Sequence, residues 1–181
     1  DMCLLKLNSA GIHQWSKRVG ASGQFCSPYM AKADAAGGLV VAGNFDGPMD
    51  FNPGAGTVNL APAGLEDVFV LKLDDTGNYA FAKKFGGGDY DSPETINIDA
   101  AGNLYTSGSF WSASVDFDPG GPTTNVNLLG MEDFFIQKLN SDGKFTSVAR
   151  IGGAGANVWG QSALDAAGNI YSGGTFVGTV D

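Results

Sequence analysis

The stretch that decides the fold is Asp67-Val-Phe-Val-Leu-Lys-Leu73, because the chain contains it three times. The other two copies lie 66 residues away on either side, as Asp1-Met-Cys-Leu-Leu-Lys-Leu7 and Asp133-Phe-Phe-Ile-Gln-Lys-Leu139. Two more motifs recur at nearly this spacing, namely Asp-Ala-Ala-Gly at 34–37, 99–102 and 165–168, and Asp-Phe-Asx-Pro-Gly at 50–54 and 116–120. A period of this length, filled with short apolar runs and glycine turns, predicts repeated units that stack on one another.

The composition favours an all-β chain. Its 181 residues include 28 glycines and 7 prolines, and no long stretch has apolar residues at the helical period. Acidic groups outnumber basic ones by 19 to 10, which repels phosphate backbones and argues against a nucleic-acid partner. No apolar run approaches the ~18 residues of a membrane span. Of the acids only three are Glu, and an excess of Asp is typical of loop-rich proteins and of calcium sites.

Each repeat predicts four short strands. A first apolar strand is followed by a tight turn that begins with Asx and has Gly in fourth place, at 8–11, 74–77 and 140–143. Four consecutive antiparallel strands make one blade of a β-propeller. We therefore expect three blades, at about 1–45, 67–110 and 133–176, joined by connectors at 46–66 and 111–132. The corresponding units of the single propeller domain are 1–66, 67–132 and 133–181.

The order of the motifs resembles a known repeat. Asp-x-Phe-x-x-Lys-Leu-Asn-x-x-Gly, then a Gly-Gly loop, then Asp-Ala-x-Gly-Asn-x-Tyr-x-x-Gly is similar to the SBBP-type bacterial β-propeller repeat, in the variant with an Asp-Phe-Asp-Pro-Gly connector. The resemblance covers essentially the whole chain. It implies a propeller and an extracellular or cell-surface location, and it implies no enzymatic activity.

Three blades are too few to close a ring of ~4–8 blades. An open arc would leave apolar blade faces in water, which stable monomers avoid. We therefore expect the partners to be further blades of the same polypeptide, the chain then being a fragment of a larger protein, or copies of the chain.

The connectors contain the candidate metal site. Asp46, Asp50 and Asn52 lie close together in the first connector, and Asp116 and Asp118 match the last two in the second. Alternating oxygen ligands on a backbone bent by Pro-Gly can hold Ca²⁺. The alternative is an Asx turn, in which each Asp accepts backbone N–H groups while Phe51 or Phe117 fills the edge of a blade. The match to an EF-hand loop is poor, because no bidentate Glu follows.

Two tryptophans are weak candidates for ligand binding. Trp111 begins the second connector and Trp159 precedes a third strand. Each ring can stack on a sugar or fill a gap between blades, and packing is the commoner role of a large ring at the end of an element. The acidic loop at 89–91 has no counterpart in the other repeats and predicts a solvated loop.

Catalysis has little support in the sequence. His13, the only histidine, aligns with Tyr79 and Phe145 and is expected to pack as an aromatic ring, so no nucleophile–histidine pair is indicated. We therefore expect a non-enzymatic extracellular or surface module for structure or adhesion, with Ca²⁺ as an optional stabiliser and a surface polysaccharide or protein as ligand. The alternative is part of a carbohydrate-active propeller, a lyase or glycosidase, which a cluster of non-repeating acids around the channel would favour.

Overall fold

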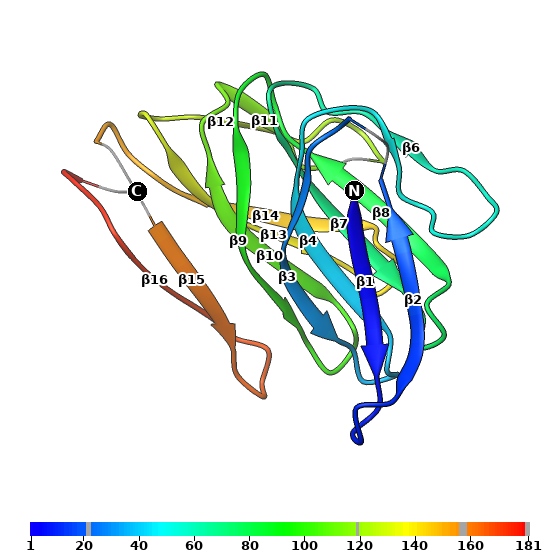
Figure 1. Ribbon diagram of the computed structural model, residues 1–181. Helices are drawn as coiled ribbons and strands as arrows, with labels where there is room; N and C mark the ends of the chain where they lie inside the picture. The colour runs from blue at the N-terminus through cyan, green and yellow to red at the C-terminus, as the bar shows by residue number, and fades with distance from the viewer. Residues whose placement is uncertain (21–22, 119, 156–158, 180–181) are drawn as a thin grey trace.

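The computed structural model describes residues 1–20, 23–118, 120–155 and 159–179, and these contain strands and turns but no helix (Figure 1). The strands of the first part of the chain are β1 (Met2–Leu7), β2 (His13–Val19), β3 (Cys26–Ala33), β4 (Leu39–Phe45), β5 (Met49–Asp50), β6 (Asn59–Leu60), β7 (Asp67–Leu73) and β8 (Tyr79–Phe85). Those of the second part are β9 (Asp91–Ile98), β10 (Leu104–Phe110), β11 (Ser114–Asp116), β12 (Asn125–Asn127), β13 (Asp133–Leu139), β14 (Phe145–Ile151), β15 (Trp159–Leu164) and β16 (Ile170–Thr175). The all-β class is therefore confirmed. In the described part of the chain, no helix is long and apolar enough to cross a membrane.

The strands form antiparallel sheets in two sizes. Two sheets have four strands, in the orders β3-β4-β7-β8 and β9-β10-β13-β14. The hairpins β1–β2 and β15–β16 form two-stranded sheets at opposite ends of the molecule (Figure 1). Each connector adds a small hairpin of its own, β5–β6 or β11–β12.

The predicted grouping of strands into blades needs correction. We expected each sheet to lie within one repeat, but each four-stranded sheet takes its first two strands from one repeat and its last two from the next. The reason is the connector, which folds back as a hairpin. The strand after the connector therefore pairs with the strand before it. Thus β4 pairs with β7 along its whole length, from Leu39↔Leu73 to Phe45↔Asp67. The described residues accordingly form two complete four-stranded sheets and two hairpins in place of three blades.

Two apolar layers lie between the sheets. One contains Val68, Val70, Phe85, Phe117 and Phe135, and joins the two four-stranded sheets. The other joins the β1–β2 hairpin to the β3–β8 sheet. Neighbouring residues of β7 therefore pack on opposite sheets, and Val70 and Leu71 are both fully buried. A strand covered on both faces needs apolar side chains at successive positions, as the repeated sequence motif has.

The tight turns follow their sequence signal. Gly11, Gly77 and Gly143 have φ between 75° and 79°, a left-handed conformation that costs glycine nothing. In the second turn type, Asp99 Oδ1 accepts the N–H groups of Ala101 and Asn103. These side-chain bonds stabilise the turn in each repeat.

Candidate functional site

Two β-bulges create the most distinctive local geometry of the chain. In β3 the pairing with β4 shifts between Pro28 and Met30, so Tyr29 has no partner across the ladder. In β9 the pairing with β10 shifts between Pro93 and Thr95, so Glu94 is likewise the extra residue. Bulges redirect a side chain out of the regular alternation and occur often beside functional sites. Proline is tolerated at these places because the ladder is already interrupted.

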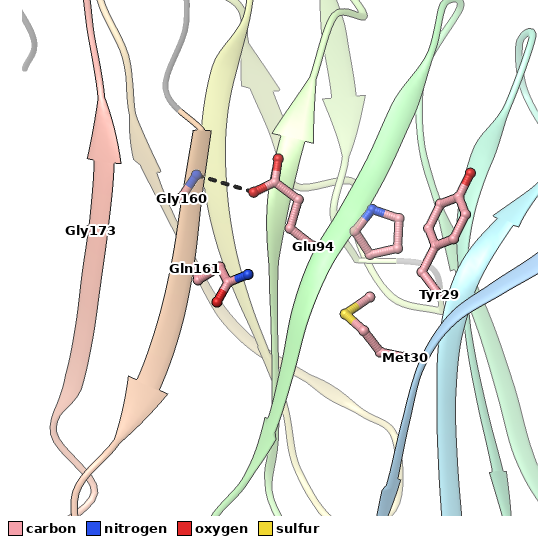
Figure 2. A pocket seen from close by; sticks show the side chains of 7 residues that line it. Tyr29, Met30, Glu94, Gly160, Gln161 and Gly173 are labelled. Atoms are coloured by element: carbon pink, nitrogen blue, oxygen red, sulfur yellow. Dashed lines mark hydrogen bonds between the residues drawn. The ribbon is translucent and has the colours of Figure 1, made fainter.

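Tyr29, Glu94 and Gly160 occupy the same position in the three repeats, five residues before the Asp of the Asp-Ala-Ala-Gly turn. All three line one hollow of about 480 Å³, together with Met30, Pro93, Gln161 and Gly173 (Figure 2). The hollow lies among β3, β9, β15 and β16. At these equivalent positions the three repeats have a phenol, a carboxyl and a glycine without a side chain. The backbone of this surface is therefore repeated, but its chemistry differs from one repeat to the next.

Glu94 is held in place at both of its oxygens. Oε2 accepts the backbone N–H of Gly160 at 3.1 Å, which Figure 2 shows as a dashed line, and Oε1 accepts the hydroxyl of Ser109 at 3.1 Å. Burial raises the pKa of the Glu94 carboxyl above its usual range, and the nearby Glu132 adds to this, while the two hydrogen bonds work in the opposite direction.

A second carboxyl shares the same hydroxyl. Glu132 is buried, and burial raises its pKa, which the hydrogen bond from Ser109 partly offsets. Its Oε1 makes no hydrogen bond among the described residues. One hydroxyl proton cannot serve two carboxylates at once, so the two carboxyls compete for the Ser109 hydrogen bond.

A second hollow, of about 440 Å³, adjoins the first through Tyr29. Its lining includes Glu66, Asp89, Tyr90 and Trp111, with Asn44 and Ser92. The Asn44 amide donates to Glu66 Oε2 at 3.0 Å, and the Trp111 backbone N–H donates to the Tyr90 carbonyl at 3.0 Å. Tyr29 and Tyr90 are each about half exposed, so two aromatic faces and the carboxyls of Glu66 and Asp89 meet solvent here, whereas Asn44 is buried.

The predicted Trp111 site thus lines the second hollow, with its ring half-buried. Trp159 begins β15 and pairs with Thr175, but its side chain lies outside the described part of the structure. The acidic loop at 89–91 is only partly solvated, which corrects the prediction. Asp91 is 1% exposed and accepts the Gly87 N–H at 2.7 Å and the Ser112 hydroxyl at 2.8 Å. Its burial raises the pKa to about 6.

The connector residues predicted to hold Ca²⁺ accept backbone N–H groups. Asp50 Oδ1 accepts from Asn52 at 2.9 Å and from Val58 at 2.8 Å. Asp116 Oδ1 accepts in the same way from Asp118 at 3.1 Å and Thr124 at 2.9 Å. These bonds define Asx turns.

Other contacts in the connectors point the same way. Asn52 and Asp118 cap the N–H groups of Gly54 and Gly120. Asp46 is directed elsewhere, because its Oδ1 accepts the Phe25 N–H at 2.8 Å.

Phe51 and Phe117, which follow the two capping aspartates, are fully buried. Asp118 also lines a hollow with Lys83 and Lys144, whose charges compete with a cation. Among the described residues, no group of three or more His, Cys, Asp or Glu side chains is placed to hold a metal ion. Calcium therefore remains a prediction from the sequence.

The structure also places the only histidine and the two cysteines. His13 is exposed on β2, which corrects the expectation that it packs; β2 is the outer strand of a two-stranded sheet. Cys3 and Cys26 are both free thiols.

Sequence reasoning missed Tyr29 and Glu94. The available signal was the proline before each of them, at 28 and 93, within a predicted strand.

Comparison with known proteins adds no assignment, since no family model and no curated protein matches this chain. The fold and the two hollows define the chain as an all-β repeat protein with polar, aromatic-lined concavities.

Proposed function

We propose that this chain is a non-enzymatic β-propeller module of an extracellular or cell-surface protein, and that it binds polysaccharide at the two hollows. The observation that carries the proposal is the placement of Tyr29 and Glu94 by bulges at equivalent positions of two repeats. Bulges turn side chains out of the regular alternation, and here both of the displaced side chains line one solvent-facing hollow.

The propeller assignment rests on the stacking of the sheets. The strands that we assign to the inside of the propeller are β3, β9 and β15, which are the first strands of their sheets. They contain the repeat-equivalent positions that line one hollow. Inner strands that converge on one concavity are expected of blades around an axis. Propeller surfaces of this kind serve binding through side chains on a rigid frame.

The chemistry of the hollows fits a hydroxyl-rich ligand. Sugars present apolar C–H faces and hydroxyl edges, so they are bound by aromatic rings together with carboxylate and amide groups. Tyr90 and Trp111 supply rings in the second hollow, Glu66 and Asp89 supply acceptors, and the Tyr29 hydroxyl supplies a donor. The net charge of −9 favours neutral or cationic polysaccharides over acidic ones.

The test is binding to a panel of neutral, cationic and acidic polysaccharides, followed by calorimetry on those retained. Trp111→Ala and Tyr90→Ala are each expected to weaken binding about tenfold, which corresponds to 1.4 kcal/mol for a lost stacking contact. Phe25→Ala is the matched control, because Phe25 occupies the Tyr90 position in the first repeat and lines neither hollow. Absence of binding across the panel, or equal losses in all three variants, contradicts the proposal.

A second candidate is a carbohydrate-active enzyme, a lyase or glycosidase. The observation in its favour is that the half-buried Glu94 and the buried Glu132 share one hydroxyl, because burial raises the pKa of both carboxyls and a carboxyl with a raised pKa can act as a general acid. Turnover of any polysaccharide in the panel, lost in both Glu94→Gln and Glu132→Gln and kept in Asp142→Asn, is expected of this candidate, because Asp142 is an exposed turn residue that lines neither hollow. A panel without turnover rejects it and leaves the binding proposal intact.

A further inference from the structure

The second hollow combines two carboxylates with three aromatic rings. Glu66 and Asp89 supply the carboxylates, and Tyr29, Tyr90 and Trp111 supply the rings. The remaining described residues of its lining are uncharged. No ion pair in the described part of the chain involves Glu66 or Asp89. The hollow therefore presents uncompensated negative charge beside aromatic faces.

Backbone contacts bring these residues together from three separate segments. Glu66 and Tyr90 form an isolated parallel bridge, in which the Asp91 N–H donates to the Glu66 carbonyl at 3.0 Å. The Trp111 N–H donates to the Tyr90 carbonyl, also at 3.0 Å. Glu66 directly precedes β7, Tyr90 directly precedes β9 and Trp111 directly follows β10, so the hollow is built on strands of the two complete sheets.

Glu66 is oriented at one oxygen and keeps the other available. Its Oε2 accepts the Asn44 amide, while its Oε1 has no hydrogen-bond partner among the described residues. A carboxylate only accepts, so the amide nitrogen of Asn44 must face it. The Asn44 Oδ1 atom then lacks a donor in the described structure, although Asn44 is only 3% exposed. The wall of the hollow thus has more acceptors than donors.

The repeat shows what distinguishes this hollow from the first. Glu132 is the equivalent of Glu66, and Glu94 stands at the position of Tyr29. Glu94 has hydrogen bonds from the protein at both of its oxygens. The carboxyl of the first hollow is therefore already occupied, whereas the second hollow has an unoccupied carboxylate oxygen and an aromatic ring at the position of Glu94.

Tyr29 links ring and charge within the second hollow. Burial raises the pKa of the Tyr29 phenol above its usual value, and the carboxylate of Glu66 adds to this, so the two groups lie close together. Tyr29 also lies at the side of the first hollow opposite Gly160, as Figure 2 shows, and it lines both hollows. A chain molecule bound in one hollow can therefore continue into the other.

Acceptors, negative charge and aromatic faces together fit a positively charged ligand. An ammonium group donates three hydrogen bonds and accepts none. It is attracted both by carboxylates and by the face of an aromatic ring. A neutral hydroxyl group can donate to the same acceptors, but it leaves the negative charge of the hollow uncompensated.

We propose that the second hollow binds the ammonium group of an amino sugar within a cationic polysaccharide. The inference rests on the proposed function and narrows its ligand to one class. The ammonium group donates to Glu66 Oε1 and to the Asp89 carboxylate, while the sugar ring stacks on Tyr90 or Trp111.

Calorimetry with three sugar hexamers of identical linkage tests the ligand class on the wild-type chain. The hexamers consist of glucosamine, N-acetylglucosamine or glucose, so they differ only in the group at one position of each ring. The glucosamine hexamer is expected to bind about tenfold more tightly than the other two, because it alone is charged.

Single substitutions test the site. Glu66→Gln and Asp89→Asn each keep the shape of the side chain and remove one negative charge. Each is expected to weaken binding of the glucosamine hexamer about fivefold and to leave that of the N-acetylglucosamine hexamer within about twofold of wild type. Asp142→Asn is the matched control and should change neither affinity, because it removes the same charge from an exposed turn that lines neither hollow.

The outcomes separate this inference from the proposed function. Equal binding of the glucosamine and N-acetylglucosamine hexamers overturns the inference and leaves polysaccharide binding intact. Equal losses in Glu66→Gln and Asp142→Asn also overturn it, because the attraction then comes from the net charge of −9 as a whole. Tighter binding of pentalysine than of the glucosamine hexamer overturns the sugar as ligand in favour of a basic peptide. Failure of all three hexamers to bind contradicts the proposed function itself.

Discussion

Phe117→Ala should destabilise the protein as strongly as a substitution in the centre of a sheet, although Phe117 lies in a connector. The ring is fully buried. Its centre lies 5.1 Å from that of Phe135, 5.3 Å from that of Phe85 and 5.9 Å from that of Phe110. The connector therefore contributes its aromatic side chain to the layer between the two complete sheets.

The magnitude follows from burial and packing. Removal of a fully buried phenylalanine ring costs about 3–5 kcal/mol, because apolar transfer energy is lost and a cavity remains. The three ring contacts place Phe117 in the upper part of this range, since each aromatic pair contributes about 0.5–1.5 kcal/mol beyond area burial. A loss of about 4 kcal/mol is a large share of the 5–15 kcal/mol that stabilises a typical domain.

The assay is urea unfolding followed by far- and near-ultraviolet circular dichroism. Phe51→Ala should show the same loss, because Phe51 stands at the equivalent position and its ring lies 5.3 Å from Phe45 and 5.1 Å from Phe69. Phe25→Ala, at a half-exposed ring, should cost less than about 1 kcal/mol. A loss below about 1.5 kcal/mol in both connector variants would refute the role of the connectors in the core.

Three more predictions concern single positions. Asp91→Asn should flatten the pH dependence of stability. The pKa of Asp91 in the folded protein, about 6, exceeds the ordinary 3.8, so between these pH values the folded state binds more protons than the unfolded state. The free energy of unfolding of the wild type therefore falls by about 3 kcal/mol as the pH rises from about 4 to above 6. Urea midpoints of both proteins at pH 4 and 7 measure this difference, and parallel pH profiles would contradict it. Gly43→Ala should lower the melting temperature by several degrees, because the new Cβ would overlap the Ser27 carbonyl oxygen opposite the bulge, whereas Gly173→Ala meets nothing within 4 Å and should melt close to wild type. Calcium at the Asp116 connector should raise stability by about 2.7 kcal/mol at a hundredfold excess over Kd, and equal melting in millimolar Ca²⁺ and EDTA would leave only the Asx-turn role.

The local structure of this chain could be predicted because its signals are local. The strand from His13 to Val19 lies between Gly11 and Gly20, and the strand from Leu104 to Phe110 begins two residues after Gly102. The turns at Gly77 and Gly143 follow from an Asx side chain that bonds its own backbone and a glycine that tolerates positive φ. The capping role of Asp50 was one of two alternatives that the spacing left open, and the structure shows that role in its bonds to Asn52 and Val58.

The pairing of strands was decided by the tertiary structure. Long connectors suggested boundaries between blades, but they fold back on themselves and β4 rejoins β7 across 21 residues. A hydrogen-bonded ladder depends on which edges meet in space, and no local pattern records that choice. The same holds for the candidate site. Glu94 and Glu132 lie 38 residues apart in the sequence, and only the stacking of β9, β10 and the start of β13 brings both carboxyls to the Ser109 hydroxyl. The repeat thus determined which strands and turns form, while contacts between distant repeats determined the sheets and the chemistry of the surface between them.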